Sequence, residues 1–75
     1  MIISLNQMRP GQSAQVVELK STDASRLDKL SAFGILPGSQ LLLSQLQPVL
    51  IFSVGETEIS VDHEVGSQIM VDSLE

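Results

Sequence analysis

The chain has 75 residues, of which 43% are hydrophobic and 17% are charged, and nine acidic against four basic side chains give a net charge of −5. This length fits one domain spanning residues 1–75, and the apolar content is too high for an intrinsically disordered chain. The absence of Cys excludes a disulfide scaffold and a thiolate metal site. The acidic balance argues against nucleic-acid binding, which requires a basic surface.

The N-terminal part of the chain predicts a helical turn followed by a strand. Ser4 is a good N-cap residue for a turn that runs to Met8. Arg9-Pro10-Gly11 then ends this turn, because proline fixes φ and glycine accepts a positive φ. Residues 14–19 are rich in valine and predict the first strand.

Residues 24–33 predict an amphipathic helix of about three turns, because apolar side chains recur at every third position. The apolar stripe consists of Ala24, Leu27, Leu30 and Phe33. Asp23 is the expected N-cap, and Arg26 stands three residues later, the spacing of an ion pair. We expect Gly34 to end the helix in the left-handed conformation, with Ile35 packing back onto the last turn.

The second half of the chain predicts strands joined by short turns. Pro37-Gly38 is typical of a type II turn, and Gly55-Glu56 of a type II′ hairpin. Asp62 is the expected cap of a short helical turn that runs to Gly66. The four strand candidates are residues 41–46, 49–54, 57–61 and 68–72. The fold class is therefore mainly β, a small closed or half-closed barrel of about five strands with one short helix after the first strand.

The register of the hairpin predicts a core face and an apolar outer face. A two-residue turn places Phe52 opposite Ile59, so that these side chains point inward, and Val49 and Ile51 point outward. The inward set is Leu50, Phe52, Val54, Ile59 and Val61. The preceding strand is apolar on both faces, and its Leu42 and Leu46 would extend the outer patch. An exposed apolar patch marks an interface, so we predict that Leu42, Leu46, Val49 and Ile51 bind a partner or a second copy of the chain.

No arrangement of residues predicts catalysis or a metal site. The chain has one His, and no nucleophile-elbow pattern surrounds any Ser, so we expect no enzyme and no cofactor. Asp62-His63-Glu64 is the best metal candidate, but adjacent side chains diverge, and a solvated turn is the favoured interpretation. No apolar run approaches the roughly 20 residues of a membrane span, and the N-terminus lacks signal-peptide features. We therefore expect a cytoplasmic protein without direct membrane insertion.

One segment carries a family resemblance. The order Lys29-Leu30, then Phe33-Gly34-Ile35, then Pro37-Gly38 resembles the signature of the FeoA family, in which a basic residue and Leu close a helix and Pro-Gly opens the next strand. The matches of Leu5, Pro10-Gly11 and Val16 extend it to the N-terminus. Gly55, Ile59, Val61, Ile69 and Val71 extend it to the C-terminus.

The resemblance implies an SH3-like β-barrel and a role in bacterial ferrous iron uptake. FeoA proteins are thought to act with FeoB, a membrane transporter. The resemblance therefore implies a non-enzymatic accessory module that contacts this transporter. The module would not itself hold iron, although the family is also described as binding transition metal ions. The alternative is a regulatory or structural interaction domain of the kind found in iron-dependent repressors, not itself DNA-binding.

Two segments depart from the family pattern. Family members usually carry a longer loop with Pro and Gly between the second and third strands, where this chain has only Gln47-Pro48. Many members also have a basic residue after the strand that ends near Val61, where this chain has Asp62-His63. If either segment touches the transporter, the contact differs in this chain.

Overall fold

The computed structural model describes residues 1–73, which form six strands, two α-helices and one 3₁₀ turn. In chain order the elements are β1 (Ile2–Ser4), η1 (Leu5–Gln7), β2 (Ser13–Leu19), α1 (Ala24–Ala32), β3 (Gln40–Gln45), β4 (Leu50–Val54), β5 (Thr57–Val61), α2 (His63–Gly66) and β6 (Ile69–Ser73). The helical turn after Ser4, the helix after Asp23 and the helical turn after Asp62 all begin where the sequence predicts.

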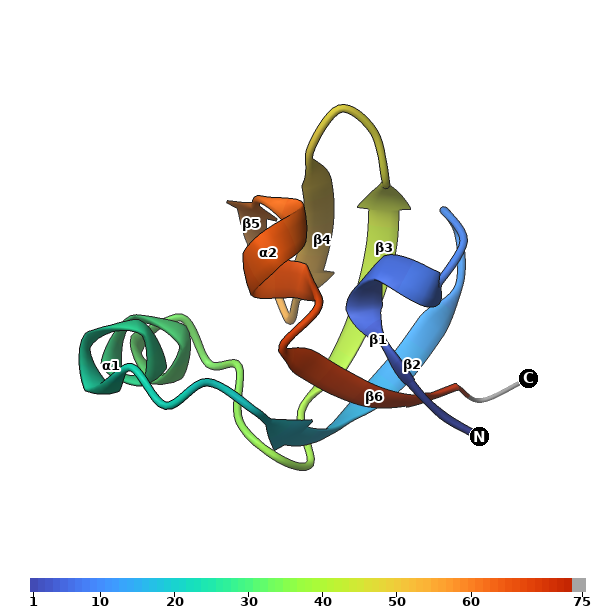
Figure 1. Ribbon diagram of the computed structural model, residues 1–75. Helices are drawn as coiled ribbons and strands as arrows, with labels where there is room; N and C mark the ends of the chain where they lie inside the picture. The colour runs from blue at the N-terminus through green and yellow to red at the C-terminus, as the bar shows by residue number, and fades with distance from the viewer. Residues whose placement is uncertain (74–75) are drawn as a thin grey trace.

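The strands form one antiparallel sheet in the order β1-β6-β2-β3-β4-β5. The sheet curls around a central core, with α1 set to one side (Figure 1). This sheet confirms the predicted mainly β class. The number of strands differs from the prediction. The structure has six strands, with α1 after the second, because the three residues of β1 also pair with β6. So short a segment has too few positions to show an alternating pattern.

The core fills the inside of the curled sheet. Its buried apolar side chains are Leu5, Met8, Ala14, Val16, Leu30, Ile35, Leu41, Leu43, Leu50, Phe52, Ile59, Ile69 and Val71. The β4–β5 pairing has the predicted register, with Leu50 opposite Val61 and Phe52 opposite Ile59. The predicted inward set is confirmed, because its two remaining members, Val54 and Val61, pack against this core.

The connection from α1 to β3 has the backbone geometry that the sequence predicts. Gly34 has φ 87° and donates its N–H to the Ser31 carbonyl, and Ile35 donates to the Leu30 carbonyl. Together these bonds make the Schellman motif that ends helices. Gly38, with φ 97°, donates to the Val16 carbonyl, which fixes the following turn against β2.

Two short helical segments close one end of the curled sheet. Leu5 and Met8 from the η1 turn are buried there, and the Asn6 amide donates to the His63 carbonyl at 2.8 Å. Gly66 lies directly beneath this contact, where an added Cβ would collide with Asn6 and Leu50. These contacts bring the N-terminal turn against α2, although the two are more than fifty residues apart in sequence.

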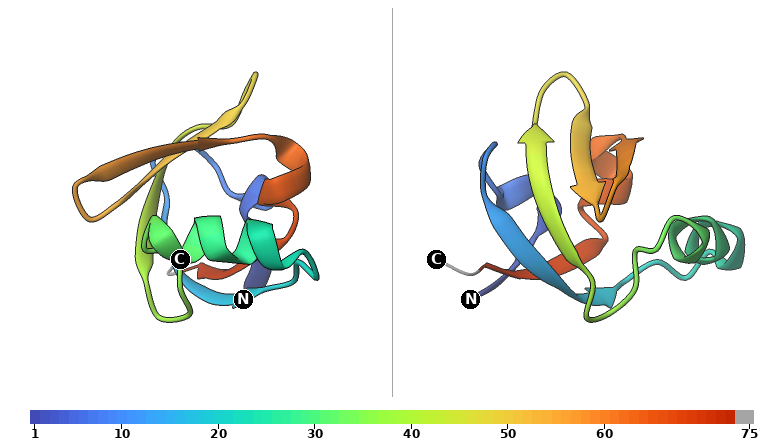
Figure 2. Two further views of the ribbon diagram at one scale, coloured as in Figure 1. Left: turned by 90° about the vertical axis from the view of Figure 1, so that its left-hand side faces the viewer. Right: turned by 180° about the vertical axis from the view of Figure 1, so that it is seen from behind.

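The helix α1 is the element least integrated into the fold. Only one residue of its apolar stripe, Leu30, is buried, while Leu27 is half-buried and Ala24 is exposed. Figure 2 shows the helix running beside the β4–β5 hairpin without entering the core. Phe33, the C-cap residue of α1, keeps 50% of its surface exposed. An amphipathic helix with an unburied apolar stripe leaves that stripe available to a ligand or partner.

Candidate functional site

A groove lies between α1 and the edge strand β5. It has a volume of about 450 Å³, within the range of ligand-binding pockets. Its apolar lining comes from α1 on one side and from β5 and α2 on the other, and consists of Leu30, Phe33, Ile59, Val61 and Val65. From the apolar stripe of the helix, the groove therefore contains the exposed Phe33 and the buried Leu30.

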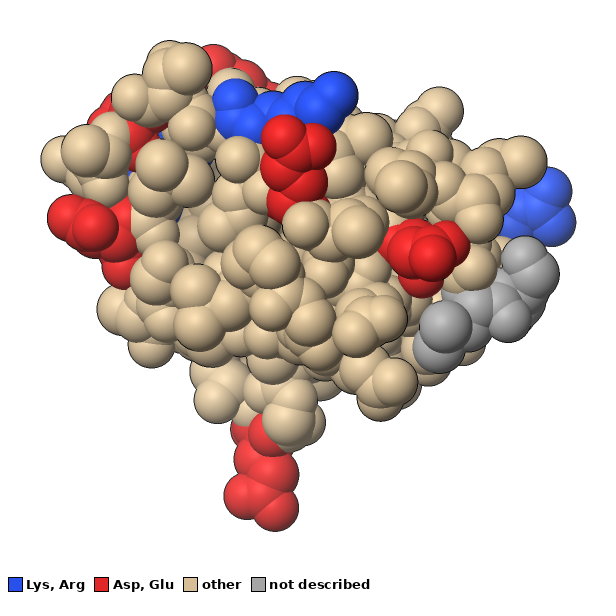
Figure 3. Space-filling model, turned by 90° about the horizontal axis from the view of Figure 1, so that it is seen from below, with Lys and Arg blue, Asp and Glu red and all other residues tan. Residues whose placement is uncertain are grey.

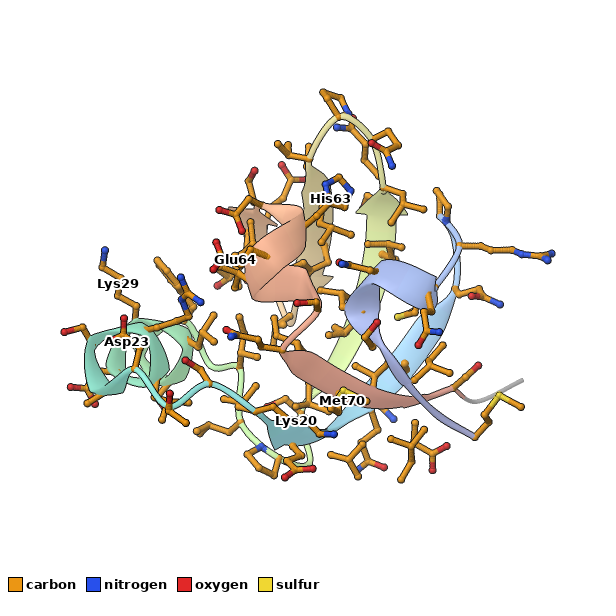
Figure 4. The ribbon with its side chains drawn as sticks, viewed as in Figure 1. Lys20, Asp23, Lys29, His63, Glu64 and Met70 are labelled. Carbon is orange, nitrogen blue, oxygen red and sulfur yellow. The ribbon has the colours of Figure 1, made fainter. Side chains whose placement is uncertain are left out.

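Two cations and two carboxylates line the groove. The cations are Arg26 and Lys29 of α1, and the carboxylates are those of Asp23 and Asp62. Both carboxylates already accept backbone N–H groups as helix caps. Lys29 projects from α1 into solvent (Figure 4) and forms no ion pair within residues 1–73. The groove thus holds two of the chain's four cations.

Arg26 differs from its predicted role. The spacing predicts an ion pair with Asp23, but the guanidinium donates to the Gln68 side chain at 2.7 Å. Asp23 instead accepts the backbone N–H groups of Ser25 and Arg26 as the N-cap. Arg26 therefore ties α1 to the segment before β6.

The predicted partner surface is brought together only in part. Leu42 and Val49 are exposed, and Ile51 is half-buried on the outward face of β4, as predicted. Leu46 does not join them, because its side chain packs against the core. A register shift between Leu43 and Gln45 places Gln45, and not an apolar residue, opposite Ile51. Polar side chains therefore interrupt this surface.

The three adjacent metal candidates point apart. His63 Nε2 lies 2.9 Å from the Leu46 carbonyl, and Asp62 accepts the Val65 N–H. Glu64 points away from His63 on the opposite side of α2 (Figure 4). Over the described residues, no group of three His, Cys, Asp or Glu side chains is placed to hold a metal ion.

The family motif has both structural and surface-forming members. Leu30, Gly34 and Gly38 build the helix end and the turn, as described above, and Pro37 occupies the first central position of that turn. Lys29 and Phe33 line the groove. In the sequence these six residues indicate a helix end and the turn after it, and the groove was not predicted from them.

Seen from below, acidic residues are spread over the face and basic residues lie at its margins. Figure 3 shows acidic groups at the left edge, at a projecting tip and within the right half of the face, with basic groups at the upper and right margins. This face includes no basic cluster of the kind that nucleic-acid binding needs. Neither helix in residues 1–73 has the length and apolar content to cross a bilayer.

Comparison with known proteins identifies the family. The FeoA domain matches residues 3–73, nearly the whole chain. The chain belongs to the FeoA family. This membership implies a role in ferrous iron transport, and FeoA domains are generally non-catalytic accessory proteins. Among curated proteins, no relative matches in sequence.

Solved structures share this fold. An iron uptake regulatory protein (FeoA) is 26% identical, with a TM-score of 0.88 and 99% of both chains covered. A zinc complex of Stenotrophomonas maltophilia FeoA, described as an SH3 domain protein, is 21% identical, with a TM-score of 0.81 over 93% of this chain and 89% of that one. The expected SH3-like FeoA fold is confirmed.

The same fold occurs within a larger protein. The T. acidophilum IdeR is 17% identical, with a TM-score of 0.89 over 96% of this chain. This chain spans only 34% of the IdeR length, so the likeness concerns one part of that protein. At this identity the comparison establishes a shared fold and nothing about activity.

Proposed function

We propose that this chain is a non-enzymatic accessory module of ferrous iron uptake that works in the cytoplasm as a single FeoA-like domain. It acts by binding the cytoplasmic region of a FeoB-type membrane transporter. The observation that carries the proposal is the groove between α1 and β5, because Phe33 at the end of α1 stays half exposed beside the apolar lining of this groove. Family membership supplies the transport context.

The groove has the composition of a protein-binding site. An exposed aromatic residue beside an apolar floor is typical of the residues that dominate binding energy at interfaces. Phe33 occupies this position, with Leu30 and Val61 beside it. Lys29 at the rim adds a charge that would guide an acidic partner surface toward the groove.

The alternative is a regulatory or interaction domain of the repressor type. Its support is the fold shared with part of the IdeR chain. A repressor domain acts beside a DNA-reading domain, and residues 1–73 contain only two short α-helices, in a chain with nine acidic and four basic side chains. The match of the FeoA domain to residues 3–73 favours the transporter hypothesis.

The outward face formed by Leu42, Val49 and Ile51 is proposed as a second contact surface, either for the transporter or for a second copy of the chain. Leu42 keeps 44% and Val49 37% of its surface exposed. Polar neighbours interrupt this face, so its contribution to affinity should be smaller than that of the groove.

A matched pair of substitutions tests the proposed function. Phe33 and Leu36 are exposed to 50% and 47%, but only Phe33 lines the groove. We expect Phe33→Ser to weaken binding of the transporter's cytoplasmic region by at least about tenfold, the loss of roughly 1.4 kcal/mol. Leu36→Ser should bind as the unchanged protein does. Calorimetric titration measures both, and equal affinities for the two variants would contradict the proposal.

A further inference from the structure

We propose that the partner enters the groove as an extended segment that adds a strand to the free edge of β5. This inference rests on the proposed function and names the binding mode at the same groove. Within residues 1–73, the strand β5 is the last in the sheet and pairs only with β4. Its other side is open, and the groove lies along it.

The hairpin register fixes which backbone groups point into the groove. A two-residue turn at Gly55-Glu56 closes on Val54 and Thr57, a pair that exchanges both backbone hydrogen bonds. Hydrogen-bonded pairs then alternate along the ladder, so Ile59 and Val61 bond to β4. Ser60 lies between them, and its N–H and C=O therefore point outward from the sheet.

The backbone of Ser60 is available for pairing. Among the described residues, neither its N–H nor its carbonyl has a hydrogen-bond partner. Ser60 is also the central β5 residue of the groove lining. An open strand edge is a template for main-chain pairing, and recognition by strand addition uses such edges. Glu58 repeats the geometry two pairs nearer the hairpin tip.

The helix beside this edge specifies the chemistry of the added strand. An extended segment directs alternate side chains to opposite sides. Those that face the floor meet Leu30, Val61 and Val65, which selects apolar residues. Lys29 has no carboxylate partner in the described part of the chain. Its free ammonium group favours an acidic side chain at the position of the added strand that lies beside it. The occupant is therefore an extended apolar segment that carries an acidic residue.

A proline substitution tests this mode with little disturbance of the sheet. Ser60→Pro removes the outward N–H, and proline is tolerated at an edge position whose N–H faces solvent. Ser60→Ala keeps the N–H and is the matched control. The probes are the cytoplasmic region of the FeoB-type transporter and overlapping peptides that cover it. We expect Ser60→Pro to weaken binding by at least tenfold and Ser60→Ala by less than twofold.

The outcomes separate this inference from the proposed function. Tight binding that Ser60→Pro leaves unchanged would overturn strand addition and retain the transporter as partner. Absence of binding by the unsubstituted protein would overturn both. A third outcome is that the unsubstituted protein forms a homodimer, binds no peptide, and loses the dimer when Ser60 is replaced by Pro. This outcome would assign the edge to a second copy of the chain and contradict the proposal.

An exchange measurement covers the case in which Ser60→Pro does not fold. Hydrogen exchange of the Ser60 amide in the unsubstituted protein should slow by at least tenfold when the transporter region is bound. An unchanged rate in a saturated complex would overturn the inference. Lys29→Gln should weaken binding of the acidic peptide severalfold, and Lys20→Gln, outside the groove, should not. Equal effects of the two substitutions would refute the proposed charge contact.

Discussion

Gly66 shows how a single atom can decide the packing between two distant segments. It ends α2, and the space that a Cβ would need is taken by the side chains of Asn6 and Leu50. The Asn6 amide nitrogen bonds to His63, while its oxygen is buried without a partner among residues 1–73. Glycine at this position therefore permits the close approach of α2 to the N-terminal turn.

Gly66→Ala should destabilise the protein by about 1–3 kcal/mol, because overpacking forces neighbouring side chains out of place. The free energy of unfolding from denaturant titration measures this. In the double variant with Asn6→Ala, the loss should be smaller than the sum of the single losses, because one colliding side chain is removed. Additive losses would show that the collision with Asn6 is not the cause.

Gly34 is constrained by backbone conformation and not by space. Its φ is 87°, while the nearest side-chain atom to an added Cβ, Val54 Cγ1, lies at an ordinary 3.9 Å. Gly34→Val should therefore destabilise by roughly 1–3 kcal/mol through backbone strain. Gly34→Asn should cost less, because asparagine tolerates the left-handed region. An unchanged denaturant midpoint for Gly34→Val would contradict this conformation.

At the scale of elements, we expect α2 to act as a connector and not as a metal site. It carries His63 and Glu64, which diverge, and its cap Asp62 is bonded to Val65. We expect Fe²⁺ and Zn²⁺ to bind no better than millimolar, because a tight site needs several converging ligands. Calorimetric titration tests this expectation. Stoichiometric micromolar binding that is lost in His63→Ala would reverse it.

The outward face of β4 gives a second prediction for an element. The double variant Val49→Ser, Ile51→Lys should remain folded, because neither residue belongs to the buried core. It should reduce self-association or transporter binding less than Phe33→Ser does, since polar residues interrupt this face. Analytical ultracentrifugation and calorimetry provide the two measurements. Unfolding of the double variant would show that this face contributes to the core.

At the scale of the whole molecule, the sequence predicts what depends on neighbouring residues. The caps Asp23 and Asp62, the left-handed Gly34 and the hairpin register all follow from residues a few positions apart. The missed features are those built from distant segments. The pairing of β1 with β6 joins the two ends of the chain, and no local pattern encodes it.

The groove was missed for the same reason. The stripe of α1 predicts a helix that covers a core, but only the folded structure shows that most of this stripe stays outside it. Leu46 shows the opposite error. Its apolar side chain was expected at the surface, but it packs against the core. Exposure on a half-closed sheet depends on curvature and bulges, which the alternation of side chains does not reveal.

The most direct test of the account is to map the transporter contact onto the folded chain. The ¹⁵N-labelled protein would be titrated with the unlabelled cytoplasmic region of a FeoB-type transporter, and amide resonances followed by NMR. The account predicts that the largest changes fall on α1 and β5, the two sides of the groove, with Phe33 and Ser60 among them. No change at saturating transporter, or changes confined to β1 and β6, would contradict it.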